Sequence, residues 1–183
     1  KEYFPILKIL SDLREAGIRI IYISGNHDFW FGSFLSRTLG IEIYQDYFSG
    51  NIFDKTLYVT HGDLHTINDL RYHFFRRFIR SFPVKLLVKM IHPTISLYLG
   101  KTLSRSSRNR QDSPELQQKK EQGLIAFAEK RLKEFDIVAM GHSHQPKLLK
   151  IQHGWYVNSG DWIKHNSYCF INHDQIEIKY NEI

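Results

Sequence analysis

The sequence predicts an α/β fold in which short buried strands end in polar loops. Three apolar runs, residues 18–23, 57–60 and 137–140, are each followed directly by a loop that contains histidine. Short apolar runs rich in β-branched residues are typical of strands buried on both faces. Ligands of open α/β sheets bind beyond the carboxyl ends of such strands. We therefore expect the three loops to converge there.

Hydrophobic spacing predicts the remaining elements. Apolar residues at helical intervals predict a helix over residues 4–13, and Gly17 follows where a left-handed residue can end it. A long helix is predicted over residues 115–135, and strands over 155–158, 167–172 and 175–180, the last two joined as a hairpin. Without an internal repeat or a linker, residues 1–183 are expected to form one domain.

A long insertion, residues 68–121, separates the second histidine loop from the third. Its first part interleaves phenylalanines with Arg71, Arg76, Arg77 and Arg80 at helical spacing, which predicts an amphipathic basic helix. Pro83 is expected to end or kink this helix before a second apolar and basic stretch. We predict a helical lid; the alternative is an ordinary solvated helix pair.

The positive charge of the chain is concentrated in this insertion. The formal net charge is +6, and residues 66–111 hold ten Lys or Arg and one acid, so that stretch carries +9 and the rest carries −3. Such a segment suits an anionic partner, for example an anionic membrane surface. Nucleic acid is not expected, because phenylalanines at helical spacing favour a coherent apolar face over separate base-stacking platforms.

The composition also bears on location. No apolar run is long enough to cross a bilayer, and the first residues do not resemble a signal peptide. The single cysteine, Cys169, cannot form a disulfide within the chain. We expect a cytoplasmic location, peripheral on the inner membrane if the lid docks there. The sequence does not indicate an oligomeric state.

The three loops hold four candidate metal ligands, Asn26, His61, His142 and His144. Neutral imidazole is the commonest metal ligand, and amide or carboxylate oxygens suit harder divalent ions, so a mixed set favours Mn, Fe, Zn or Ni over Ca. An isolated His-x-His could equally be a satisfied surface pair. Its occurrence in one of three aligned loops favours the metal site.

The loops resemble a known family. Residues 25–28 (Gly-Asn-His-Asp), 61–63 (His-Gly-Asp) and 141–144 (Gly-His-Ser-His) resemble three of the five signature blocks of the calcineurin-like metallophosphoesterases. The resemblance implies a four-layer α/β/β/α sandwich and two divalent ions, with Mn the first expectation. By the same resemblance, Asn26, His61 and His142 bind one ion and His144 binds the other.

The resemblance also assigns the chemistry and leaves a gap. It implies that His27 protonates the leaving oxygen or stabilises the transition state, with Asp28 orienting it. The family's Asp-x-His and Gly-Asp blocks, expected before Gly25, are not present in this chain. The chain is therefore predicted to be an N-terminal truncation that alone binds metal poorly and is inactive. A non-catalytic relative that binds lipid or a partner is the alternative.

A narrower resemblance covers nearly the whole chain. Residues 25–30, residues 61–63 followed by Asp69, and residues 159–162 resemble the UDP-2,3-diacylglucosamine diphosphohydrolases of lipid A synthesis. This implies hydrolysis of UDP-2,3-diacylglucosamine to UMP and 2,3-diacylglucosamine 1-phosphate, with the acyl chains lying over the lid. The alternative is a generalist phosphodiesterase or phosphatase of the same superfamily.

The same resemblance suggests substrate contacts within the insertion. Asp69 would face the sugar, while Arg105, Ser107 and Arg108 would contact the diphosphate and glucosamine. His27 stands where several members have arginine, so the substrate of this chain is expected to be handled differently.

Overall fold

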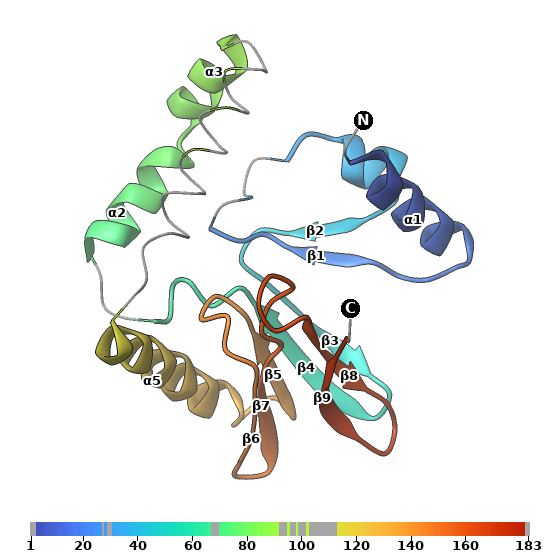
Figure 1. The fold of residues 1–183 in the computed structure, drawn as a ribbon, viewed down its shortest axis with the longest axis vertical. Helices are drawn as coiled ribbons and strands as arrows, with labels where there is room; N and C mark the ends of the chain where they lie inside the picture. Colours follow the sequence, from blue (N-terminus) through green and yellow to red (C-terminus); the bar gives the residue numbers. More distant parts are fainter. Residues whose placement is uncertain are drawn as a thin grey trace.

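The computed structural model describes residues 3–26, 28, 31–66, 70–91, 95, 98, 102 and 113–181, without the side chains of residues 70–72 and 89. The chain contains helices and a mixed sheet, and the α/β class predicted from the sequence is confirmed (Figure 1).

A five-stranded mixed sheet carries two of the three histidine loops. Its strands, in spatial order, are β3 (Tyr47–Ile52), β4 (Lys55–Thr60), β5 (Ile137–Met140), β7 (Gly154–Asn158) and β6 (Lys147–Ile151). The three central strands run parallel, with Thr60 opposite Met140 and Met140 opposite Asn158. Their carboxyl ends therefore lie level at one edge of the sheet.

The first predicted strand is shorter than expected and lies in another sheet. Strand β1 (Ile21–Ile23) pairs in parallel with β2 (Glu42–Tyr44), a strand that the sequence did not predict. The residues of β1 are half-buried, because β2 is its one partner among the described strands. A π-helical turn, η1 (Phe34–Thr38), lies between them in sequence and was also not predicted.

The first helix, α1 (Phe4–Glu15), ends as the sequence predicts. Gly17 has a φ of +82°, and the N–H groups of Gly17 and Ile18 donate to the carbonyls of Arg14 and Leu13. This is the Schellman arrangement, which satisfies carbonyl groups that the helix leaves free at its end. Gly17 therefore turns the chain from α1 towards β1.

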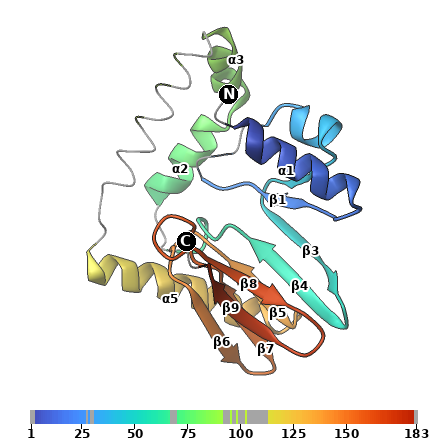
Figure 2. The same cartoon turned by 45° about the vertical axis from the view of Figure 1, so that its right-hand side comes forward.

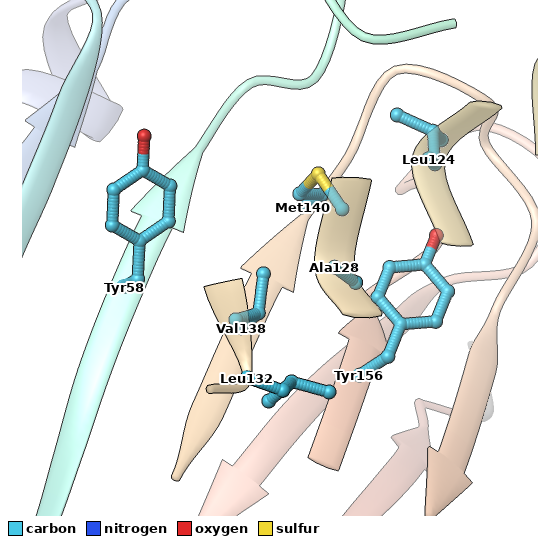
Figure 3. Close-up of a cluster of buried hydrophobic side chains, with 7 residues drawn as sticks. All are labelled: Tyr58, Leu124, Ala128, Leu132, Val138, Met140 and Tyr156. Atoms are coloured by element: carbon cyan, nitrogen blue, oxygen red, sulfur yellow. The ribbon is translucent and has the colours of Figure 1, made fainter. Parts of the chain in front are cut away.

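The main core lies between the sheet and α5 (Pro114–Arg131). Ser113 caps this helix by accepting a hydrogen bond from the N–H of Leu116, and the helix ends four residues before the predicted 135. In Figures 1 and 2, α5 and the C-terminal hairpin lie on opposite sides of the five-stranded sheet. The buried cluster comprises Tyr58, Leu124, Ala128, Leu132, Val138, Met140 and Tyr156 (Figure 3).

The C-terminal hairpin is present but forms a sheet of its own. It consists of β8 (Ser167–Ile171) and β9 (Ile176–Tyr180), paired antiparallel. The hairpin predicted from the sequence is therefore confirmed, and it is a separate two-stranded sheet rather than part of the five-stranded one. The parallel strands consequently end at β7, and its loop lies beside the candidate site.

The described part of the insertion contains two consecutive helices, α2 (Leu70–Ile79) and α3 (Phe82–Met90). Pro83 lies in the first turn of α3, where its missing N–H leaves no helical hydrogen bond unmade, so the break falls just before it. Figure 1 shows the two helices following one another away from the sheet. No helix in the described ranges has the length and apolar content needed to cross a membrane.

Candidate metal centre

Three side chains from three loops meet beyond the carboxyl ends of the strands. Asn26 follows β1, His61 follows β4 and His142 follows β5. The Asn26 Oδ1 atom lies 3.1 Å from His61 Nε2, and His61 Nε2 lies 3.3 Å from His142 Nδ1. The convergence of the loops predicted from the sequence is present for these three residues.

This spacing suits a shared cation. Metal–ligand distances of about 2.0–2.2 Å for imidazole nitrogen and oxygen donors imply neighbouring ligands roughly 3.0–3.5 Å apart around one ion. Among the described residues, no three His, Cys, Asp or Glu side chains are grouped so that they could hold a metal ion. The group described here has only two histidines, and its third donor is the amide oxygen of Asn26. The three residues present therefore fit one face of a divalent-metal site and supply no negative charge to it.

The environment of His142 keeps its imidazole neutral. Burial, with a smaller contribution from the neighbouring His61, lowers its pKa from 6.5 to about 4. A histidine must be unprotonated at the nitrogen that binds a metal ion. At neutral pH His142 is therefore in the state that metal binding requires.

The loop after β5 is held in place by Asn158, at the end of β7. Its buried side chain donates to the Gly141 carbonyl over 2.9 Å and to Ser143 Oγ over 2.8 Å, and it accepts from the Gly160 N–H over 3.1 Å. The support matters because His142 has a φ of +64°, a conformation that non-glycine residues rarely adopt. Asn158 thus ties the loop of His142 to the loop after β7.

His144 projects from the same loop towards Asp161. Its Nδ1 lies 3.4 Å from Asp161 Oδ2, and its side chain is 59% exposed. Burial alone would raise the pKa of Asp161, but the backbone N–H groups of Lys164, Ile163 and His165 hold that pKa below its usual range. Asp161 therefore remains a carboxylate beside His144, an arrangement typical of residues that orient metal-binding histidines.

The loop of Asn26 is shaped by Asp28 and Gly25. Asp28 accepts hydrogen bonds from the Gly25 N–H, at 2.9 Å, and from the Tyr22 hydroxyl. A Cβ atom at position 25 would lie 2.5 Å from Asp28 Oδ1 and 3.3 Å from His61 Cε1. Only glycine fits without displacing these groups, so this close approach explains the glycine before Asn26.

The remaining predicted site residues lie outside the described residues. They are His27, Asp69, Arg105, Ser107 and Arg108. Their roles stay predictions.

The arginines of α2 do not form the single exposed basic face that the sequence suggested. Arg76 Nε lies 3.1 Å from Asp63 Oδ2, and Arg76 Nη2 lies 3.2 Å from Asp46 Oδ1. Arg80 donates to the carbonyl of Gly25 over 3.1 Å. Sequence reasoning missed these contacts because the acceptors come from distant segments. The four-residue interval places both arginines on one helix face, but it does not indicate which groups that face meets.

Comparison with known proteins identifies the family. Residues 3–146 match the calcineurin-like phosphoesterase family model. The chain belongs to this family. Calcineurin-like phosphoesterases use divalent metal ions, which agrees with the donor set formed by the three loops.

Curated relatives of this calcineurin-like phosphoesterase are named UDP-2,3-diacylglucosamine hydrolase. The protein of Haemophilus ducreyi is 24% identical over 155 residues, covering 84% of this chain and 65% of the relative. That of Porphyromonas gingivalis is 28% identical over 177 residues, covering 87% and 68%. That of Blochmanniella pennsylvanica is 26% identical over 193 residues, covering 98% and 74%. The chain thus spans about two thirds of the length of the first two.

Among solved structures, vacuolar protein sorting 29 from Cryptosporidium parvum matches with a TM-score of 0.34 and 11% identity. The match covers 77% of this chain and 58% of that chain. A likeness of this size supports no conclusion about fold or function.

Proposed function

We propose that Asn26, His61 and His142 bind one divalent metal ion of a phosphoester hydrolase and that His144 is a ligand of a second. The observation that carries this proposal is the meeting of three donor side chains beyond the strand ends, where His61 Nε2 lies 3.1 Å from Asn26 Oδ1 and 3.3 Å from His142 Nδ1. Membership of a phosphoesterase family supports it independently.

The three converging donors form an incomplete site. Neutral ligands do little to offset the dehydration of a divalent ion, so tight binding requires carboxylates as well. Asp63, the nearby buried acid, pairs with Arg76. We propose that the Asp-x-His and Gly-Asp blocks expected before Gly25 supply these carboxylates in a longer protein. The present chain alone should then bind metal weakly and be inactive.

Each part of the site would have a separate role in hydrolysis. Bound divalent ions would neutralise charge on the phosphoryl oxygens and activate the attacking water, with Mn the first candidate and Fe, Zn or Ni the others. His27 would protonate the leaving oxygen. Asp28 would fix the loop of Asn26 and His27 through its bond from the Gly25 N–H.

The substrate that we propose is UDP-2,3-diacylglucosamine, cleaved to UMP and 2,3-diacylglucosamine 1-phosphate in lipid A synthesis. Curated relatives carry the name of this hydrolase. Exposed apolar side chains on α2 and α3 support a lipid ligand, because large exposed apolar patches often mark ligand-binding or membrane-interaction sites. They include Phe74, Phe75, Phe78, Phe82, Leu87 and Met90.

The remaining substrate and membrane contacts would come from polar residues of the insertion. Asp69 would contact the sugar, and Arg105, Ser107 and Arg108 the diphosphate and glucosamine. Arg77 and Lys85 are exposed beside the apolar side chains, so the lid could dock at an anionic membrane surface. The protein would then work from the cytoplasm, at the periphery of the inner membrane.

The test uses the natural protein with any residues upstream of Lys1, supplied with Mn²⁺ and UDP-2,3-diacylglucosamine. We expect UMP release that falls at least a hundredfold in His142→Ala, whereas His153→Ala, at an exposed turn of the same half of the chain, should retain full activity. Strong turnover of aryl phosphates or cyclic nucleotides without UMP release would favour a generalist phosphodiesterase. An absence of all turnover would favour a non-catalytic binding protein.

A further inference from the structure

Two arginines of α2 contact the loops that hold the candidate metal ligands. The Arg76 side chain, 16% exposed, lies between the carboxylates of Asp63, which is 5% exposed, and Asp46. Arg80, 15% exposed, donates to the Gly25 carbonyl, and its Nη1 lies 3.9 Å from Asp46 Oδ1. The two arginines thus face the protein and not the solvent.

The contacted groups flank the ligands closely in sequence. Asp63 is two residues after His61, Gly25 directly precedes Asn26, and Asp46 lies just after β2, the partner of β1. Through these contacts α2 bridges the loop of the two-stranded sheet and the loop of the five-stranded sheet. Because Asn26 and His61 come from these two different sheets, their separation depends on what joins the sheets at this point.

We propose that Arg76 and Arg80 are positioning residues that hold the loops of Asn26 and His61 in register, so that docking of α2 and the geometry of the metal ligands are linked. The proposal rests on the metal site proposed above. A guanidinium can serve two carboxylates at once in a fixed geometry, which a single lysine ammonium does less well. A buried carboxylate such as Asp63 requires a partner of this kind.

The link has two consequences. Binding energies that are coupled act in both directions, so a metal ion held by the loops should stabilise the docked position of α2, and docking should raise metal affinity. In addition, Arg76 and Arg80 are engaged with the protein and are not free to bind the phosphates of a substrate. Among the described residues of α2 and α3, that task would pass to an exposed cation such as Lys85.

The first experiment tests the positioning role without metal. Amide hydrogen exchange is compared between this chain and its Arg76→Gln and Arg77→Gln variants, since Arg77 is the exposed neighbour on the same helix. We expect exchange in residues 61–66 to become several-fold faster in Arg76→Gln and to be unchanged in Arg77→Gln. Arg76→Lys, which keeps the charge, should restore part of the protection. Equal exchange in all variants would overturn the proposal.

The second experiment measures Mn²⁺ affinity by electron paramagnetic resonance in the natural protein and the same variants. We expect affinity about tenfold weaker in Arg76→Gln, as for other residues that support metal ligands, and unchanged affinity in Arg77→Gln. Mn²⁺ should also slow amide exchange in α2, which an ion pair that merely fastens the helix would not explain. Equal Mn²⁺ affinity in both variants would overturn the link. Failure of the parent protein to bind Mn²⁺ would instead refute the metal site, and the metal-free exchange would still decide the positioning role.

Discussion

Asn158 offers a quantitative test of how the loop of His142 is held. Replacing it by leucine keeps a side chain of similar size. The replacement removes the two N–H donors and the oxygen acceptor of the amide. The lost partners are the Gly141 carbonyl, Ser143 Oγ and the Gly160 N–H. Each hydrogen bond contributes about 1 kcal/mol net, so the variant should lose about 3 kcal/mol of unfolding free energy.

The assay is urea unfolding followed by tryptophan fluorescence. With a slope of about 2 kcal/mol per molar urea, the midpoint should fall by roughly 1.5 M. Asn51→Leu, at an exposed position of β3, is the matched control and should change the unfolding free energy by less than about 0.5 kcal/mol. If the two variants are equally stable, the three hydrogen bonds of Asn158 do not hold the loop as described.

Two further predictions concern packing and pH. Gly123→Ala in α5 should destabilise the protein, because the alanine Cβ would lie only 1.8 Å from the Thr66 carbonyl oxygen, although alanine favours helices over glycine by about 1 kcal/mol. The midpoint of thermal unfolding should be lower than that of the exposed-site control Gln122→Ala. A higher midpoint would contradict the close packing. Burial lowers the pKa of His142 in the folded state from 6.5 to about 4. Between these pH values only the unfolded chain takes up the proton. The contribution of neutral His142 to the unfolding free energy is therefore complete above pH 6.5 and is lost towards pH 4, by up to about 3 kcal/mol. Urea unfolding across this pH range should show the loss, and an equally steep loss in His142→Asn would assign it to other groups.

Local pattern was sufficient to predict the elements that end in the site. The strands ending at Thr60 and Met140 were predicted because buried parallel strands are short apolar runs, and the end of α1 because Gly17 can adopt a positive φ. Their loops could then be expected to converge, as Asn26, His61 and His142 do. The neighbouring parallel strands β4 and β5 place His61 beside His142, whereas Asn26 reaches them from another sheet.

Other features depend on signals that the sequence does not carry. Strands β3 and β6 were missed because the turns that join them to β4 and β7 place Phe53 and Gln152, not glycine, at a φ of +54°. The pairing of β1 with β2 in a separate sheet, and of Arg76 with Asp63, joins segments that are adjacent only after folding. Periodicity places Arg76 on a helix face, but it cannot indicate which acid that face meets.

Asn26, His61 and His142 are proposed to bind one divalent ion. The most direct test of this assignment is anomalous diffraction at the manganese edge from crystals of the natural protein, including any residues upstream of Lys1, grown with Mn²⁺. We expect an anomalous peak about 2.0–2.4 Å from Asn26 Oδ1, His61 Nε2 and His142 Nδ1. A well-occupied manganese ion elsewhere, with these three atoms still in mutual contact and no peak between them, would contradict it.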